Sequence, residues 1–189
     1  PYVIAYEMLN GSDRHNVVGN INTLVQFNPK LSLALRSGTD FSYEFRSQQR
    51  PLSTYKYKNG MYRQQNVFRI EVNSDFLLKY DDQLPFGLNY TVSVGGNQRY
   101  SDYKYDNAMA DKLVLPDVYN LANSADPVQT SSDRMRFAVN SLYSFINLDY
   151  KGKIYLELTG RNDWSSSLPK KNASFFYPSV STSILLNKI

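Results

Sequence analysis

The sequence predicts an all-β protein, a segment of an antiparallel transmembrane β-barrel with about eight consecutive strands. Three observations support this fold class. Several segments alternate apolar and polar residues, and two of them run for about 15 residues, longer than most strands of globular domains. Short and long connections alternate between the segments. The chain is also rich in aromatic residues, with 16 Tyr and 10 Phe among 189 residues, which suits strands at a lipid–water boundary.

The first two predicted strands are 16 to 27 and 31 to 45, joined by a tight turn at Asn28-Pro29-Lys30. One parity of the second strand carries Leu31, Leu33, Leu35, Phe41, Tyr43 and Phe45. The other parity carries Ser32, Arg36, Asp40, Ser42 and Glu44. A period of two puts these sets on opposite faces of a strand.

The next pair of strands is predicted over 66 to 80 and 86 to 97, with a short turn at 81 to 85. In the first of them, Phe68, Ile70, Val72, Phe76, Leu78 and Tyr80 alternate with Arg69, Glu71, Asn73, Asp75 and Lys79. Gly95-Gly96 indicates a bend near the end of the second strand.

Four less regular strands complete the prediction. They cover 137 to 150, 153 to 162, about 175 to 186, and a short apolar start near 2 to 9. The connections at 28–30, 81–85 and 151–152 are short, whereas those at 46–65, 99–136 and 163–174 are long. The connection at 10–15 falls at the same end of the strands as the long ones. Outer-membrane barrels have short periplasmic turns and longer extracellular loops, so this alternation assigns each strand end to one side of a membrane.

A soluble, carbohydrate-binding β-sandwich also alternates apolar and polar residues, and a self-contained eight-stranded outer-membrane barrel with an adhesive or structural role fits the strand count. Strand length and aromatic residues near both strand ends favour a membrane barrel over the sandwich. The charges on the polar face favour a wide hydrated lumen over a small closed bore. The candidate lumen-lining residues are Arg36, Asp40, Glu44, Arg69, Glu71 and Asp75.

Composition argues against several other classes of function. Cysteine is absent and His15, expected in a solvated loop, is the single histidine, so we expect no transition-metal site, no cofactor, no Ser-His-Asp arrangement and no enzyme. The net charge of +4 is spread along the chain, which does not favour nucleic-acid binding. No apolar run reaches about 18 residues, and the first residues lack the pattern of a signal peptide.

A long motif near the C-terminus is similar to the signature of SusC/RagA-family TonB-dependent transporters. It comprises Leu158-Thr159-Gly160-Arg161-Asn162-Asp163-Trp164-Ser165-Ser166-Ser167-Leu168-Pro169, followed by Asn172, Ser174 and Phe176-Tyr177-Pro178-Ser179-Val180-Ser181. Shorter stretches resemble the same family in the same order, namely Asn16 to Asn20, Gly38 to Phe41, Val94 to Asn97 and Val139 to Tyr143.

The resemblance implies a bacterial outer-membrane barrel of 22 strands with an N-terminal plug, in which 1–189 would be part of one barrel domain without the plug. Family members import oligosaccharides or peptides, work with a SusD-like surface lipoprotein, and draw energy from the TonB complex. By this resemblance, the chain would be a barrel segment of an active nutrient importer in the lipid bilayer, with its TonB contact in the missing N-terminal part.

Two further groups of residues are candidates for specific roles. Loop 99 to 136 is predicted to contact ligand or lid through Tyr100, Asp102, Tyr103, Tyr105 and Asp106. The motif residues Arg161, Asn162, Asp163 and Trp164 are expected to be structural, since polar residues at a strand end bond the local backbone and an aromatic can anchor at the interface. Pro178 suggests an irregularity in the last strand or a limit to pairing there.

Overall fold

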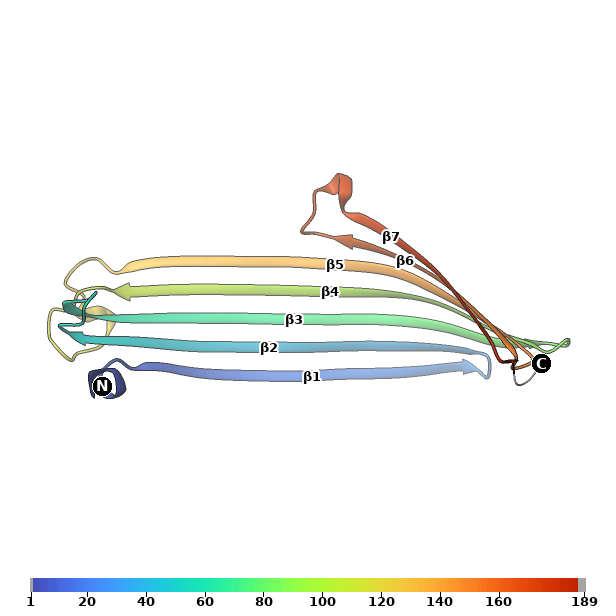
Figure 1. The fold of residues 1–189 in the computed structure, drawn as a ribbon, viewed down its shortest axis with the longest axis horizontal. Coiled ribbons are helices and arrows are strands. Elements are labelled where there is room, and N and C mark those ends of the chain that lie inside the picture. The colour runs from blue at the N-terminus through green and yellow to red at the C-terminus, as the bar shows by residue number, and fades with distance from the viewer. Residues whose placement is uncertain (1, 187–189) are drawn as a thin grey trace. The chain divides into compact units, whose positions relative to one another are not determined.

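The computed structural model describes residues 2–186, which form one seven-stranded sheet whose strand order follows the chain (Figure 1). Its strands are β1 (Asn10–Asn28), β2 (Leu31–Leu52), β3 (Asn59–Leu84), β4 (Leu88–Ala110), β5 (Gln129–Tyr150), β6 (Ile154–Ser165) and β7 (Ser174–Ile184). Two short 3-10 helices, η1 (Leu121–Asn123) and η2 (Lys170–Asn172), lie in connections. The predicted all-β class is confirmed. Within 2–186, β1 and β7 are the two sheet edges, so these strands do not close a barrel.

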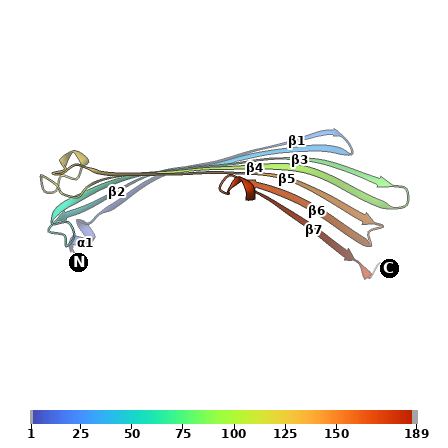
Figure 2. The same cartoon turned by 90° about the horizontal axis from the view of Figure 1, so that it is seen from above.

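The strand predicted near 2 to 9 is wrong, because this segment forms helix α1 (Tyr2–Tyr6). The chain joins the sheet only after the helix, where the Gln49 amide donates to the Leu9 carbonyl at 2.9 Å. Figure 2 shows α1 beside the end of β2. A short apolar run without a turn signal is compatible with either a helical turn or a strand, and the sequence pattern could not separate them.

The strands extend further than predicted at the long-loop side. The connections there are 53–58, 111–128 and 166–173, and the predicted 10–15 connection, with His15, lies inside β1. The extended parts are polar on both faces, so they lack the alternation that marks a strand, although their backbone groups still pair across the sheet.

The short turns are at 29–30, 85–87 and 151–153, close to where the sequence predicted them. In the first, the Asn28 side chain accepts hydrogen bonds from the amides of Lys30 and Leu31 at 2.8 and 2.9 Å. In the second, Gly87 has a φ of +85°, a conformation that favours glycine.

The described chain divides into two compact units, and strands β1 to β5 contribute residues to both. Unit 1 comprises 1–18, 40–70 and 101–136, and unit 2 comprises 19–39, 71–100 and 137–189, with 1 and 187–189 outside the described residues.

Four apolar side chains of unit 1 are buried, namely Met61, Val67, Ala110 and Leu113, and the last of them belongs to the 111–128 connection. Asn123 orders the connection, because its side-chain amide donates to the carbonyls of Leu115 and Val118 at 2.8 and 2.7 Å, and its Oδ1 accepts from the Leu115 amide at 3.0 Å. This long connection is therefore folded upon itself by one buried polar side chain.

Unit 2 carries a regular sheet with two contrasting faces. The β6–β7 register is continuous, with Leu158 opposite Val180 and Gly160 opposite Pro178, so the irregularity proposed at Pro178 is not observed. β4 continues through Gly95, where a Cβ would meet the Phe76 carbonyl oxygen at 2.7 Å and the Tyr143 ring. Glycine is thus required by close packing.

One face of unit 2, here the apolar face, exposes large aliphatic and aromatic side chains. Its members on β1 to β5 and β7 include Ile21, Val25, Leu35, Phe76, Leu78, Val94, Leu142, Ile146 and Val180. Soluble monomers rarely expose such a continuous apolar surface, so this face indicates contact with an apolar medium or partner.

Candidate functional site

The opposite face of unit 2, here the polar face, carries a network of paired charges and amides. Arg36 Nε lies 2.7 Å from Asp75 Oδ1. Arg99 binds both oxygens of Glu71 through Nε and Nη2, at 3.0 and 2.8 Å. Three of the predicted lumen-lining residues, Arg36, Glu71 and Asp75, are therefore brought into cross-strand pairs.

Aromatic and amide groups extend this polar face. Asn97 Nδ2 donates to Asn73 Oδ1 at 2.8 Å, and the Arg161 guanidinium lies 5.9 Å from the centre of the Tyr143 ring. Together these groups line a hollow of about 610 Å³ whose walls include Arg36, Asn73, Asp75, Asn97, Tyr143, Arg161 and Tyr177. Its paired charges and hydroxyl groups suit a hydrated surface.

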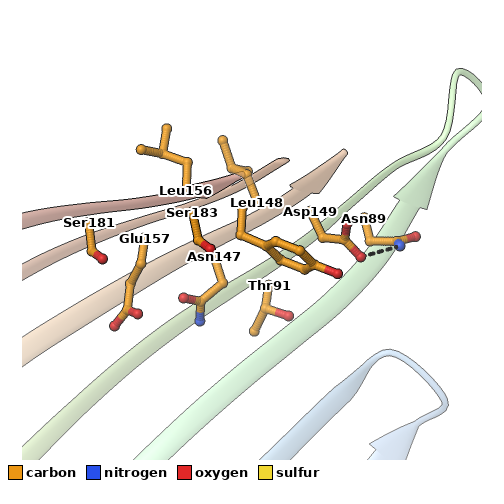
Figure 3. A pocket seen from close by; sticks show the side chains of 10 residues that line it. Asn89, Thr91, Asn147, Leu148, Asp149, Leu156, Glu157, Ser181 and Ser183 are labelled. Atoms are coloured by element: carbon orange, nitrogen blue, oxygen red, sulfur yellow. Dashed lines mark hydrogen bonds between the residues drawn. The ribbon is translucent and has the colours of Figure 1, made fainter. Parts of the chain in front are cut away.

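A second hollow on unit 2, of about 450 Å³, lies near the short turns. Figure 3 shows its lining, in which Asn89 Nδ2 donates to Asp149 Oδ2 at 3.2 Å. The labelled side chains are mainly hydroxyls, amides and carboxylates from β4 to β7, with two leucines.

Another predicted lumen-lining residue, Glu44, is the centre of a charge cluster in unit 1. Arg46 Nε and Arg14 Nη2 lie 2.7 and 2.6 Å from its carboxylate oxygens, and Ser12 Oγ donates to it at 2.7 Å. The hydrogen bonds from Arg46, Ser12 and Arg14 hold the pKa of the Glu44 carboxyl well below its usual range. Glu44 is therefore a buried, charged anchor between β1 and β2.

The other two predicted lumen-lining residues differ from Glu44. The Arg69 guanidinium lies 5.6 Å from the centre of the Tyr103 ring. Asp40 is exposed, and its side chain makes no ion pair or hydrogen bond with another residue of 2–186.

The predicted ligand contacts at 100–106 do not lie in a loop, because all five residues belong to β4. Asp102 is buried and binds Arg134 at 2.6 Å and Arg136 at 3.3 Å. Asp106 accepts from Ser132 at 2.6 Å and pairs with Lys104 at 2.7 Å.

Two of the three aromatic members of this set, Tyr103 and Tyr105, lie on the opposite face of β4 from the two aspartates. Tyr103 contacts Arg69, and Tyr105 accepts a hydrogen bond from Gln65, whereas the even-numbered Tyr100 shares the parity of the two aspartates. The five candidates thus occupy both faces of one strand and do not form a single site.

The motif residues 161–164 lie at the end of β6. Arg161 Nε binds Asp163 at 2.7 Å, its Nη2 donates to Ser141 at 3.0 Å, and Asn162 Nδ2 donates to Ser174 at 2.9 Å. Trp164 is partly exposed on the parity of the apolar face, opposite Asn140. This geometry fits a structural role, which stays a prediction.

A pocket that the sequence analysis missed lies in unit 1, where the β2–β3 and β4–β5 connections meet. Its volume is about 640 Å³, and its lining includes Tyr55, Lys56, Tyr57, Lys58, Asn59, Arg63, Asp111, Lys112 and Gln129. A signal was present in the sequence: residues 45–70 hold six Lys or Arg (Arg46, Arg50, Lys56, Lys58, Arg63 and Arg69) and no Asp or Glu.

Within residues 2–186, no group of three or more His, Asp or Glu side chains is arranged to hold a metal ion. No helix there has both the length and the apolar character needed to cross a bilayer.

Comparison with known proteins gives one curated relative. The chain is 26% identical over 183 residues to the TonB-dependent receptor P26 of Formosa agariphila, a match that covers 90% of this chain and 18% of the relative. No protein-family model matches the chain.

Solved structures give closer agreement in fold. The chain is similar to the RagAB peptide transporter, with a TM-score of 0.88 and 17% identity, covering 95% of this chain and 20% of the other. The RagAB peptide importer in its "open-open" state gives a TM-score of 0.82 at 20% identity, with the same coverage of both chains. The siderophore receptor PiuA of Acinetobacter baumannii gives 0.50 at 14% identity, covering 92% of this chain and 29% of PiuA.

The chain therefore has the fold of a TonB-dependent receptor barrel segment, and the resemblance to SusC/RagA-type transporters predicted from its motifs is confirmed. It spans about a fifth of the length of these relatives.

Proposed function

We propose that the chain is a wall segment of a TonB-energised importer in a bacterial outer membrane, and that residues 1–189 are part of its barrel domain. The observation that carries the proposal is the contrast between the two faces of unit 2. A bare apolar face suits lipid, and the opposite face, with the Arg36–Asp75 and Arg99–Glu71 pairs, suits a hydrated lumen.

Similarity supports the remaining parts of the proposal. The relatives are a TonB-dependent receptor and the RagAB peptide transporter, and an importer of this kind moves its cargo without covalent chemistry. By the family resemblance, the complete protein would contain a plug that contacts TonB and would bind a SusD-like surface lipoprotein as a lid. Its cargo would be an oligosaccharide or a peptide.

Neither alternative from the sequence analysis is favoured. A sandwich requires two packed sheets, whereas residues 2–186 form one sheet. A self-contained small barrel requires β1 to pair with β7, and in the described strands these two are opposite edges.

The membrane assignment can be tested with single cysteines in the full-length protein, because this segment contains none of its own. Leu142 and Thr130 have the same parity on β5, in unit 2 and unit 1 respectively. We expect a fluorophore on Leu142→Cys to be quenched by brominated lipid, and Thr130→Cys to react with an impermeant maleimide on intact cells. The assignment would be overturned if brominated lipid did not quench the fluorophore on Leu142→Cys, or if the protein were released without detergent.

The importer assignment needs a separate experiment. The native polypeptide, purified from outer membranes in detergent, should be several times heavier than 21.8 kDa and should retain a surface lipoprotein and bind the periplasmic domain of TonB. A native polypeptide of the size of this chain, which binds neither, would contradict the importer role and leave the membrane-barrel assignment intact.

A further inference from the structure

The basic pocket of unit 1 contains more cationic than anionic groups. Lys56, Lys58, Arg63 and Lys112 line it, with Asp111 as its one carboxylate among the described residues. Lys112 is already paired with Asp126 at 2.6 Å, and Asp111 accepts a hydrogen bond from Gln129 at 3.0 Å. Three cations are left without a carboxylate partner within 2–186: Lys56, Lys58 and Arg63.

Arg63 differs from the two lysines because it has a buried donor without a hydrogen-bond partner. Nη1 donates to Gln48 Oε1 at 3.3 Å, and Nη2 donates to the Met109 sulfur, a weak acceptor, at 3.1 Å. Its Nε is covered from solvent and has no hydrogen-bond acceptor in the described chain. A guanidinium has five donors in a planar fork that matches the oxygens of a carboxylate or sulfate, so this side chain is a ready ligand for an oxyanion.

The rest of the pocket suits a sugar chain. The Tyr55 ring is fully exposed, and Lys56 Nζ lies 5.6 Å from the centre of the Tyr57 ring, which leaves two aromatic side chains beside the cations. Exposed tyrosines offer an apolar face and a hydroxyl tip, and the amides of Asn59 and Gln129 add hydrogen-bonding groups for hydroxyls.

We infer that this pocket binds an oligosaccharide carrying oxyanion groups, either sulfate esters or uronate carboxylates, with Arg63, Lys56 and Lys58 on the anion and Tyr55 against a sugar ring. The inference rests on the proposed importer role in one respect, because it takes the bound sugar to be the cargo of the importer. Binding itself needs neither TonB nor a membrane potential.

The test is calorimetric titration of the detergent-purified full-length protein. The probes are sulfated dextran and unmodified dextran of the same length, with oligogalacturonate and its methyl ester as a second pair and hexaglutamate as a peptide. We expect at least one anionic sugar to bind at least tenfold more tightly than its neutral counterpart, with preference for the sulfate or the carboxylate identifying the source of the anion.

Variants assign the binding to this pocket. Arg63→Gln combined with Lys56→Gln and Lys58→Gln should weaken binding of the anionic sugar by roughly ten- to a hundredfold, whereas Arg63→Lys, which keeps the charge and loses the planar fork, should weaken it less. The control is Lys104→Gln, in the same unit, whose ammonium is held by Asp106 on the other parity of β4.

Three outcomes would overturn the inference: no preference for the anionic sugars, tighter binding of hexaglutamate, or a triple variant that binds like the wild type. Because binding is measured in detergent solution, such a failure is separate from failure of the importer role, which the lipoprotein and TonB experiment decides.

Discussion

Units 1 and 2 share strands β1 to β5 but differ in what those strands carry at positions of the same parity. On β5, Leu142 and Ile146 in unit 2 are exposed apolar residues, whereas Ser132, Arg134 and Arg136 in unit 1 are polar or charged. On β4, Val94 has its counterparts in Asp102 and Asp106. Strands β1 to β5 run through both units without interruption, so the two units differ in the side chains that these strands carry.

This difference shows that backbone pairing defines a strand. The pattern of its side chains depends instead on what surrounds each face. In unit 2 one face is apolar, and stability in the proposed bilayer depends on keeping it so. In unit 1, β4 and β5 carry mainly polar residues on both faces, and the Arg134–Asp102 and Arg14–Glu44 ion pairs, whose carboxylates are buried, join neighbouring strands.

The largest effect on stability is expected from a charge placed on the apolar face of unit 2. Ile146→Arg should destabilise the full-length protein by about 2–4 kcal/mol, because Ile146 lies on the apolar face of unit 2 that is proposed to meet lipid. Denaturant titration in lipid vesicles measures the free energy of unfolding. The matched control, Thr130→Arg, has the same parity in unit 1 and should change it by less than about 0.5 kcal/mol. Equal effects at both positions would mean that the two units meet the same medium.

A somewhat smaller effect is expected where unit 2 is tightly packed. Gly95→Ala should cost about 1–3 kcal/mol, since its Cβ would meet the Phe76 carbonyl oxygen at 2.7 Å and the Tyr143 ring. Gly19→Ala is the control, because a Cβ there has no neighbour within 4 Å in the described structure. The same titration should show Gly19→Ala to be neutral or slightly stabilising. A harmless Gly95→Ala would show that the polar face is loosely packed.

The smallest effect on stability is expected from the loss of an ion pair in unit 1. The bonds from Arg46, Ser12 and Arg14 lower the pKa of Glu44 in the folded protein, so its contribution to stability is complete above about 4.5, the ordinary value, and is lost as the pH falls below it. Glu44→Gln should therefore lower stability at pH 7 and flatten the acid side of the pH–stability curve. Asp40→Asn, on the same strand and without a side-chain partner among residues 2–186, should leave the curve unchanged. An unaltered acid limb in Glu44→Gln would show that the cluster does not control acid stability.

The sequence predicted the fold best where one face is apolar. The alternation at 31–45 and 66–80 and the turns at Asn28 and Lys151–Gly152 agree with the structure. The same criterion failed at 100–110, where Tyr, Asp and Lys residues occupy both faces of β4 and resemble a loop. Hydrogen bonds to neighbouring strands hold that segment, and those long-range bonds have no local signature.

The candidate site was predicted only in part. Arg36, Glu71 and Asp75 form cross-strand pairs on the polar face as strand parity suggested, although their role in lining a lumen stays a prediction. The basic pocket was missed because its members come from three strands and two connections. The absence of acidic residues over 45–70 could have indicated it, but only the fold brings Arg63 beside Lys112 and Gln129.

The order of the strands has a consequence for how such a protein forms and how it changes over evolution. Each strand pairs with the one that precedes it in the chain, so the sheet can grow one hairpin at a time, and each step closes only a short stretch of chain. Folding of this kind joins only strands that are neighbours in the chain and avoids threading one strand between others already in place. For the same reason, duplication of a hairpin can add two strands to the sheet without rearranging the existing pairs.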